Sequence, residues 1–271
     1  MLNRIRKENP VIHCITNHVV SNFQANGLLA IGASPIMGEA KEEVEELVAI
    51  SGALSLNIGT LNKETLDSMI LAGKEANKRG IPVILDPVGA GATAFRKAAV
   101  EKILTEVDVQ VLRCNAAEIA AIAGVSSGSS KGVDAGHANV DVEELANRMA
   151  RTYGLIAAVT GEADMVTDGY QVQKISGGDP MMASVTGMGC LLSSVTAAFV
   201  AMDPENPGAA TLQALRFYGA AGEQAAGISK GPGSFREAFL DVLFTMKQQE
   251  PEVEFHKTEG GEELWWRSNR Y

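Results

Sequence analysis

The first part of the chain alternates between short apolar runs and longer amphipathic segments. Continuous apolar runs bounded by glycine and polar residues are typical of strands that are buried on both faces of a sheet. Five such runs predict strands: Val11–Cys14, Ala53–Ile58, Ile81–Leu85, Val109–Leu112 and Leu155–Val159.

Between these runs, apolar residues recur at the spacing of a helix. The clearest case is Asn62–Arg79, because Gly80 follows in the position that often ends a helix in a left-handed conformation. The same pattern predicts four more helices: His18–Ile31, Phe95–Val107, Ala116–Ala123 and Val142–Tyr153. The Ser-, Gly- and Lys-containing segment Ser126–Asn139 predicts a loop.

Alternation of strands and helices at this spacing predicts an α/β fold with a central parallel sheet. Asp168–Gly169, between the runs Met165–Thr167 and Tyr170–Lys174, is a strong signal for a hairpin with a two-residue turn. The C-terminal third reads as almost wholly helical. We predict one domain over residues 1–271, with 258–271 as a loose C-terminal tail.

Composition agrees with this class and excludes others. The chain has 271 residues, of which 46% are hydrophobic, 5% are aromatic and 28 are glycines. A net charge of −10 argues against a nucleic-acid partner bound through a basic face. No apolar run is long enough to span a membrane, and Met1–Pro10 lacks the apolar core of a signal peptide. Cys14, Cys114 and Cys190 are far apart, which argues against a disulfide framework or zinc site and fits a cytoplasmic protein.

Polar and glycine-rich clusters follow several of the predicted strands. In parallel sheets of this kind, ligands bind beyond the carboxyl ends of the strands, so these clusters are expected to converge on one site. The clusters are Ile15–Asn17, Asp86–Thr93, Arg113–Glu118 and Thr160–Glu162.

A glycine turn, Thr186–Cys190, stands where the apolar segment Leu191–Met202 begins as a helix. The first N–H groups of a helix have no partner within it, and the helix dipole adds positive charge there. Gly187, Met188 and Gly189 therefore predict an anion hole for phosphate. The alternative is a helix that merely starts at a glycine-rich turn.

Three charged residues in the clusters suit phosphate chemistry. Asp86 and Glu118 together could hold a hydrated Mg²⁺ that bridges phosphates, and Arg113 suits a phosphate oxygen. Each has a simpler alternative: Asp86 could cap a turn, Glu118 could form a capping box with Asn115, and Arg113 could make a surface salt bridge.

Two common nucleotide-binding classes are disfavoured. No Walker A pattern occurs in the sequence, and Gly89–Gly91 lacks the third glycine of a dinucleotide fingerprint. What remains is an ATP-dependent small-molecule kinase that uses the glycine turn as its anion hole.

Nine segments of the sequence, in order from about residue 10 to residue 240, match one family pattern: Ile15–Asn17, Asn26–Ala30, Gly32–Met37, Asn57–Thr60, Leu85–Thr93, Asn115–Glu118, Thr160–Glu162, Thr186–Cys190 and Lys230–Phe235. With these segments the chain resembles the hydroxyethylthiazole kinase family, which belongs to thiamine salvage and has a ribokinase-like fold. The segment Gly32–Met37 and the Cys that ends the glycine turn distinguish it from other ribokinase-like kinases.

The resemblance implies a three-layer sandwich, a mostly parallel sheet flanked by helices. It implies phosphorylation of the primary hydroxyl of 4-methyl-5-(2-hydroxyethyl)thiazole by MgATP, giving the phosphate ester and ADP. It also implies a homotrimer with sites at subunit interfaces. By matching motif it assigns the thiazole to Met37 and Gly187, with Asn17 as a further polar contact. It assigns ATP to Arg113 and Thr160.

The same resemblance assigns Mg²⁺ and the phosphates to Asp86 and Glu118, and it places Cys190 at the position of the catalytic base. Ribokinase relatives carry a carboxylate there. A thiol at a helix N-terminus gains ionisation from the dipole and loses it to the charge of ATP, so Cys190 occupies the base position without being an efficient base.

The chain departs from the family pattern in two places. Arg113-Cys114-Asn115 stands where the family has Arg-Gly-Asn, and Cys114 is expected to crowd the phosphates or to strain the backbone if that position needs a positive φ. The tail Glu259–Tyr271, with Trp265 and Trp266, matches nothing in the family. The alternative functions are a nucleotide-dependent hydratase, a kinase for another vitamin alcohol, and a non-catalytic nucleotide sensor disabled by Cys114.

Overall fold

The computed structural model describes residues 1–125 and 141–247. The loop predicted over Ser126–Asn139 and the C-terminal tail with Trp265 and Trp266 lie outside the described residues. The extent of the domain over residues 1–271 therefore stays a prediction.

One mixed sheet organises the part of the chain that is described. It has eight strands in the order β2-β1-β3-β4-β5-β6-β7-β8, of which β2 to β6 run parallel and β7 and β8 are added antiparallel at one edge. The strands are β1 (Val11–Ile15), β2 (Ser34–Ile36), β3 (Ala53–Asn57), β4 (Val83–Asp86), β5 (Val111–Asn115), β6 (Ile156–Thr160), β7 (Asp164–Thr167) and β8 (Val172–Ile175).

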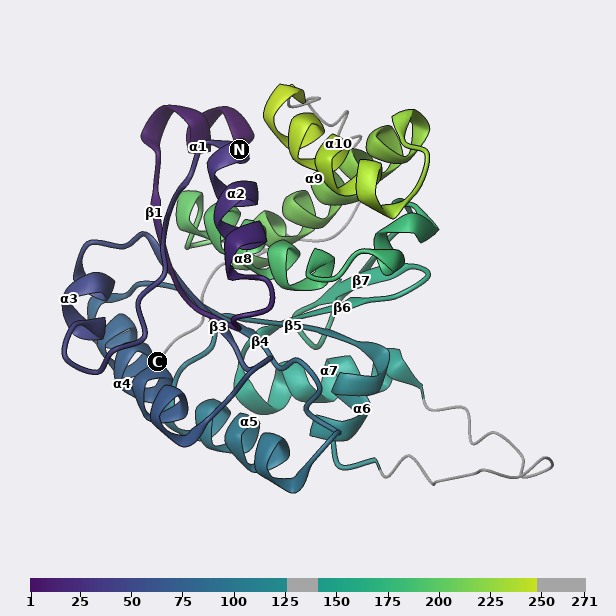
Figure 1. The fold of residues 1–271 in the computed structure, drawn as a ribbon. Helices are drawn as coiled ribbons and strands as arrows, with labels where there is room; N and C mark the ends of the chain where they lie inside the picture. Colours follow the sequence, from purple (N-terminus) through teal and green to yellow (C-terminus); the bar gives the residue numbers. More distant parts are fainter. Residues whose placement is uncertain (126–140, 248–271) are drawn as a thin grey trace, which may run out of the picture.

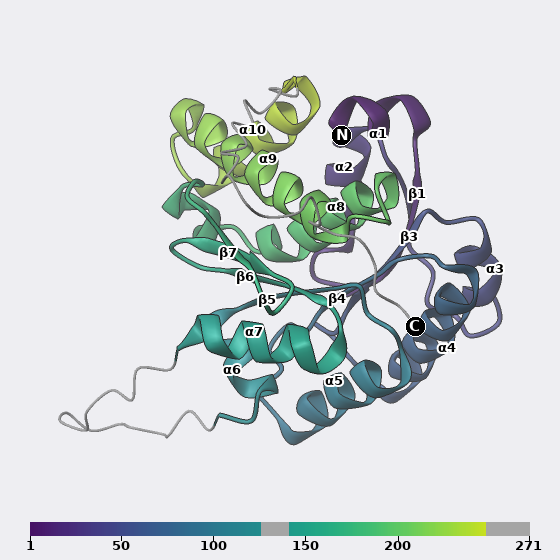
Figure 2. The ribbon, with the colours of Figure 1, turned by 180° about the vertical axis from the view of Figure 1, so that it is seen from behind.

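Helices cover both faces of the sheet, so the predicted three-layer sandwich is confirmed (Figures 1 and 2). One layer holds α1 (Leu2–Glu8), α2 (Ser21–Ile31), α8 (Met188–Met202), α9 (Pro207–Ile228) and α10 (Pro232–Thr245), with the short 3-10 helix η1 (Pro180–Ser184) beside it. The other layer holds α3 (Val44–Ala49), α4 (Lys63–Arg79), α5 (Ala94–Glu106), α6 (Ala116–Ile122) and α7 (Val142–Tyr153).

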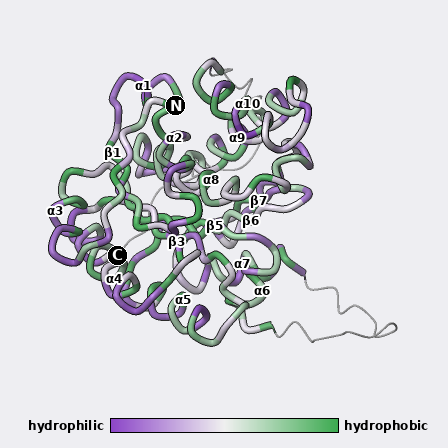
Figure 3. The backbone as a smooth tube through the Cα atoms, viewed as in Figure 1, coloured by the Kyte–Doolittle hydropathy of each residue, from purple (hydrophilic) through white to green (hydrophobic). Residues whose placement is uncertain are grey.

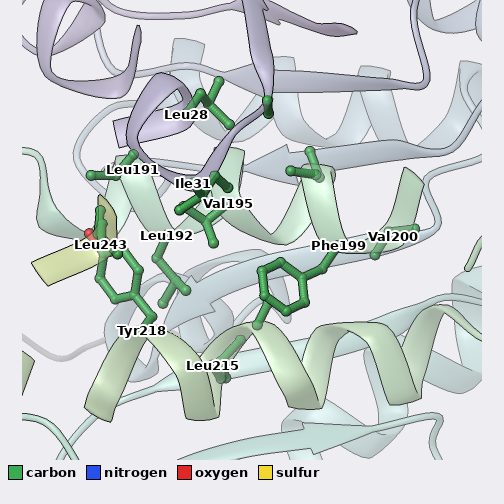
Figure 4. Packing of buried hydrophobic residues seen from close by; sticks show 14 of the residues in the cluster. Leu28, Ile31, Leu191, Leu192, Val195, Phe199, Val200, Leu215, Tyr218 and Leu243 are labelled. Carbon is green, nitrogen blue, oxygen red and sulfur yellow. The ribbon is translucent and has the colours of Figure 1, made fainter. Parts of the chain in front are cut away.

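The core lies between the sheet and each helix layer. Successive residues of a strand point to opposite faces, so Val111 packs on the α8 side whereas Leu112 packs on the α4–α7 side. Figure 3 shows the hydrophobic segments gathered in the central strands and hydrophilic ones on outer helices such as α4. Helix α8 is central to its layer, where Leu191, Val195 and Phe199 pack between α2 and α9 (Figure 4).

Local sequence signals account for the helix ends that were predicted well. The Asn62 side chain accepts a hydrogen bond from the Thr65 amide and caps α4, and Gly80 ends this helix at φ 68° as expected. Helix α7 has the predicted bounds because Asp141 caps its start and Gly154 ends it with a positive φ.

Other boundaries differ from the prediction. Helix α2 begins at Ser21 rather than His18, because residues 18–20 form a turn. The hairpin between β7 and β8 exists, but its register leaves the four residues 168–171 in the loop rather than two. The Asp168 carboxylate accepts the Tyr170 and Gln171 amides and so stabilises this longer loop. Helices α1 and α3 and strand β2 were not predicted.

Candidate active site

The carboxyl ends of five parallel strands meet at one edge of the sheet, as predicted. Asn57, Asp86, Asn115 and Thr160 are the last residues of β3, β4, β5 and β6, and Asn17 follows β1 by two residues. The predicted clusters therefore come together in the fold.

Helix α8 begins at this edge with its first N–H groups uncapped by any side chain. Gly187 precedes it with φ 92°, and a Cβ there would lie 2.6 Å from the Val20 side chain, so the turn requires glycine. The Tyr218 hydroxyl donates to the Met188 carbonyl at 2.7 Å and holds the first turn in place. The geometry is that of an anion hole made of backbone amides.

Arg113 lies against this turn and is buried. A Cβ on Gly189 would stand 2.9 Å from its Nη2, so glycine here gives the guanidinium its place. Nη2 donates to Thr160 Oγ1 at 2.9 Å, and Nη1 lies 3.5 Å from Asp86 Oδ1. The Nε atom has no hydrogen-bond partner. Burial lowers the pKa of Arg113, but the carboxylates of Asp86 and Glu118 more than offset this, and the net shift is upward.

The predicted position of Arg113 beyond the strand was wrong, and so was the alternative of a surface salt bridge. Strand β5 runs to Asn115, so Arg113 is a strand residue that points to the α8 side. A buried strand rarely contains an arginine without a partner, so the apolar pattern alone predicts that the strand ends at Leu112. Its partner Asp86 comes from the neighbouring strand.

Asp86 is fully buried and receives its donors from side chains. Asn57 Nδ2 donates to Oδ2 at 2.8 Å and Ser193 Oγ donates to the same atom at 2.9 Å. Burial raises the pKa of Asp86 to about 6, although the nearby Arg113 charge lowers it. The bonds given to this carboxylate are not those of a turn cap.

Glu118 forms the capping box that the sequence left open as its alternative role. Its Oε2 accepts the Asn115 amide and the Asn115 side chain accepts the Glu118 amide, both at 2.9 Å. Its Oε1 accepts the Gly89 amide at 2.9 Å and so ties the loop after β4 to α6. Among the described residues, no three His, Cys, Asp or Glu side chains converge as a metal site.

Cys190 stands in the first turn of α8 beside Asn17, toward the β1 side of the sheet. The Asn17 Nδ2 atom donates to its Sγ at 3.5 Å. Burial and the nearby Asp86 carboxylate raise the pKa of the thiol to about 11. Cys190 is therefore a neutral thiol at physiological pH.

Cys114 does not intrude on the site, so the expected crowding and strain are wrong. The only non-glycine residue with a positive φ in the described chain is Asn9, so the backbone at position 114 is ordinary strand. The Cys114 side chain is fully buried among apolar residues on the α4–α7 side, opposite to Arg113. Residue alternation along β5 separates the two.

An open cleft of about 510 Å³ adjoins the glycine turn on the β6 side. It lies between the ends of β5 and β6, η1 and helices α8 and α9. Arg113 and Thr160 line the cleft, and Met182, Leu192 and Leu215 provide apolar surface. The cleft thus combines a cation and free amides with an apolar slot, as a nucleotide requires.

Met37 lies apart from this cleft. It follows the edge strand β2 and is 38% exposed. The next residue is held by His13, whose Nε2 lies 2.7 Å from the Gly38 carbonyl oxygen. The described residues leave the substrate role of Met37 a prediction.

Three polar residues of the site were missed from the sequence. Asn57 and Ser193 bind Asp86. Arg96 donates to the carbonyls of Ile58, Gly59 and Val88 and so pins the loops after β3 and β4 together. The only signal was the position of Asn57 in the segment Asn57–Thr60, because the partners of Ser193 and Arg96 are distant in sequence.

Comparison with known proteins decides the family. A model of the "Hydroxyethylthiazole kinase family" matches residues 2–249. Hydroxyethylthiazole kinase of Lysinibacillus sphaericus is 49% identical over 245 residues, which cover 90% of this chain and 95% of the relative. The chain belongs to the hydroxyethylthiazole kinase family. Hydroxyethylthiazole kinase of Shouchella clausii is also 49% identical, over 90% of this chain and 94% of the relative.

Solved structures agree with this membership of the hydroxyethylthiazole kinase family. A hydroxyethylthiazole kinase protein from Pyrococcus horikoshii has a TM-score of 0.83 at 40% identity, covering 91% of this chain and 92% of its own. A ribokinase-like superfamily protein from Enterococcus faecalis has a TM-score of 0.63 at 12% identity over 86% of both chains, which supports the fold alone. Within residues 1–125 and 141–247, no helix combines the length and apolar character needed to span a bilayer.

Proposed function

We propose that this protein phosphorylates the primary hydroxyl of 4-methyl-5-(2-hydroxyethyl)thiazole with ATP, giving the phosphate ester and ADP, as a step of thiamine salvage. The observation that carries the proposal is the open N-terminus of α8, which separates the Arg113–Thr160 cleft from the Asn17–Cys190 pair. A donor phosphate on one side and an acceptor hydroxyl on the other would meet at the glycine turn.

On the nucleotide side, Arg113 and Thr160 bind the phosphates of ATP. The amides of Gly187, Met188 and Gly189 receive the transferred phosphoryl group, whose charge is spread over three oxygens in a loose transition state. The unpartnered Nε of Arg113 and its close packing on Gly189 support this assignment.

Asp86 and Glu118 would hold an Mg²⁺ ion that accompanies ATP, through the water shell of the ion. Asp86 Oδ2 already accepts two hydrogen bonds, but Asp86 Oδ1 faces Arg113 and each Glu118 oxygen accepts one amide, so both groups retain capacity for a hydrated ion. Mg²⁺ keeps several waters and commonly uses few protein carboxylates beside substrate phosphates. A bound ion would neutralise charge on the phosphates.

On the acceptor side, Asn17 orients the hydroxyl and Gly187 contacts the thiazole, while the Met37 that contacts it comes from a neighbouring chain. The hydroxyl oxygen attacks the γ-phosphorus and the bond to the bridging oxygen of ADP breaks. The hydroxyl proton passes to an oxygen of the transferred phosphoryl group, because Cys190 at the base position can take it only in its small ionised fraction. With a thiol of raised pKa in this position, catalysis rests on alignment and charge neutralisation more than on base strength.

We also propose that the protein is a cytoplasmic homotrimer in which Met37 faces the site of a neighbouring chain. The exposure of Met37 and its separation from the cleft support this arrangement. Three free cysteines agree with a reducing compartment.

A coupled ADP-release assay tests the function. With Mg²⁺ present, we expect turnover with hydroxyethylthiazole well above that with hydroxymethylpyrimidine or ribose. Equal rates with the pyrimidine alcohol would reject the substrate assignment. Binding of ATP without turnover of any alcohol would favour the nucleotide sensor, whose main argument is weakened because Cys114 lies in the core.

A further inference from the structure

We infer that Asn57 is a positioning residue that fixes the acceptor-side Asn17 and the phosphate-side Asp86 relative to each other. This inference rests on the proposed function, since it concerns how the two halves of that site are aligned. It assigns a role to a residue at the end of a central strand that neither touches the cleft nor carries a charge.

The hydrogen bonds of Asn57 link the two halves directly. Its Oδ1 accepts from Asn17 Nδ2 at 2.8 Å, and its Nδ2 donates to Asp86 Oδ2 at 2.8 Å. Asn17 Nδ2 also lies 3.5 Å from Cys190 Sγ. One side chain therefore joins the thiol and amide on the acceptor side to the carboxylate beside Arg113.

The orientation of the Asn57 amide is determined by its surroundings. Its Oδ1 faces two donors, Asn17 Nδ2 and the Gly59 amide at 3.0 Å, while its Nδ2 faces a carboxylate that only accepts. A flipped amide would place donors against donors and an oxygen against an oxygen. The arrangement thus requires one donor and one acceptor in the same planar group.

The strands and the neighbouring loop leave these groups little freedom. Asn57 and Asp86 are register partners in the parallel pair β3–β4, so their side chains stand side by side. A Cβ on Gly59 would lie 2.7 Å from Asn17 Nδ2, which shows how closely the loop after β3 packs on Asn17. All three polar side chains are buried, so water does not readily replace a lost partner.

Loss of Asn57 therefore removes an acceptor from Asn17 and a donor from Asp86 together. Asn57 makes no hydrogen bond of its own to Arg113 or Thr160, and without Asn57 the Asp86 carboxylate still accepts from Ser193 and still faces Arg113. A displacement of reacting groups by about 1 Å can cost on the order of 100-fold in rate. The effect is expected in kcat and in the KM for the thiazole, while the KM for ATP is spared.

The test compares Asn57→Leu, a change to an apolar side chain of similar size, with Asn57→Ala. In steady-state assays with varied MgATP and a saturating thiazole concentration, we expect kcat to fall about 100-fold, with the KM for ATP within about threefold of wild type. ATP titration by calorimetry measures the nucleotide side independently, and thermal unfolding confirms that the variants fold. If Asn57→Ala does not fold, Asn57→Leu alone decides the outcome.

The matched control is Gln110→Leu, which removes an amide at the opposite end of the strands. Gln110 Oε1 accepts the Val83 amide at 2.6 Å, far from the site edge. This control is expected to lower the melting temperature and to leave kcat per folded molecule unchanged. Equal kcat losses in Gln110→Leu and Asn57→Leu would overturn the inference, because the effect would then follow stability.

A double-mutant cycle with Asn17→Ala tests whether Asn57 acts through its neighbour. If the two amides work as one unit, the kcat of the double variant should be within about threefold of the kcat of the slower single variant. Multiplicative losses, or a kcat of Asn57→Leu close to wild type, would contradict the inference while wild-type thiazole turnover stands. If the wild type does not phosphorylate the thiazole, the proposed function fails, and the same cycle is measured on the alcohol that the panel assay identifies.

Discussion

Replacing Cys190 with aspartate tests whether this position accepts the proton of the acceptor hydroxyl or acts as a covalent nucleophile. Cys190 stands in the first turn of α8, and its Sγ lies 3.5 Å from Asn17 Nδ2, on the side where the acceptor would bind. Aspartate is close to cysteine in size, so Cys190→Asp places a carboxylate there with little change in shape. The change alters mainly the strength of the proton acceptor.

The size of the effect follows from the ionisation of the two groups. With a pKa of about 11, only about one Cys190 thiol in ten thousand is ionised at pH 7. If burial raised the pKa of the new carboxyl to about 6, as it does for Asp86, roughly nine in ten of these carboxyl groups would still be ionised at pH 7. General-base assistance contributes on the order of 10²- to 10⁴-fold. Repulsion from Asp86 and the phosphates offsets part of this gain, so we expect turnover at or above that of wild type.

Single-turnover rates with saturating MgATP and hydroxyethylthiazole measure the chemical step. Cys190→Ser should be active but slower than wild type, because a serine hydroxyl ionises far less than a thiol and so supplies less of the form that accepts a proton. The pH dependence adds a second measure. The wild-type rate should rise as pH approaches the thiol pKa of about 11, whereas the Cys190→Asp rate should be nearly level above about pH 7.

One result would refute this reasoning: loss of all activity in Cys190→Asp while the protein remains folded and binds ATP. If Cys190 were instead a covalent nucleophile, both substitutions would abolish turnover, and a phosphorylated thiol would accumulate in the wild type. Mass spectrometry of the quenched reaction detects that species.

Three further predictions concern the nucleotide side and the core. Gly189→Ala should raise the KM for ATP about tenfold or more, because the new Cβ would stand 2.9 Å from the Arg113 guanidinium. Gly227→Ala is the control, since a Cβ there has nothing within 4 Å, and an unchanged KM for ATP in Gly189→Ala would contradict the prediction. The kcat/KM for ATP should fall as pH drops through about 6, because protonation of Asp86 removes the negative charge that pairs with Arg113 and Mg²⁺. A kcat/KM that is constant from pH 5 to 7 would exclude this role of the Asp86 charge. Cys114→Gly, which restores the family pattern, should lower the unfolding free energy by about 1–3 kcal/mol and leave kcat unchanged; a higher kcat would show that the thiol obstructs the site.

Local patterns in the sequence were sufficient for most of the fold. Helix α4 was predicted closely because its cap Asn62 and its terminator Gly80 lie in the sequence itself. The glycine turn at the start of α8 could be predicted for the same reason, because the glycine that this turn needs at position 187 is visible in the neighbouring sequence. Edge strand β2 was missed because its three residues are too few to give a periodic pattern.

Tertiary partners explain what the sequence could not give. Arg113 can lie inside a buried strand because Asp86 on β4 pairs with its charge, and no local pattern in the sequence shows that pairing. The sequence leaves Glu118 both a capping and a metal role; the contacts of its oxygens with backbone amides confirm the capping box, and the metal role stays a proposal. The sequence alone gives Asn57 no role, because its partners are Asn17 in the loop after β1 and Asp86 on strand β4.

Helix α8 joins two properties that many enzymes keep apart. Its first turn carries the glycine turn and Cys190, while the rest of the same helix, including Val195 and Phe199, is buried at the centre of the larger apolar layer (Figure 4). Catalytic groups on loops can be altered with little effect on folding, but here a repacking beneath α8 is expected to shift the proposed anion hole as well, because both belong to one helix. Substitutions in this helix that are selected for heat stability would therefore also change the alignment of the phosphoryl group. Neutral substitutions in the core around α8 are expected to change the turnover rate as well.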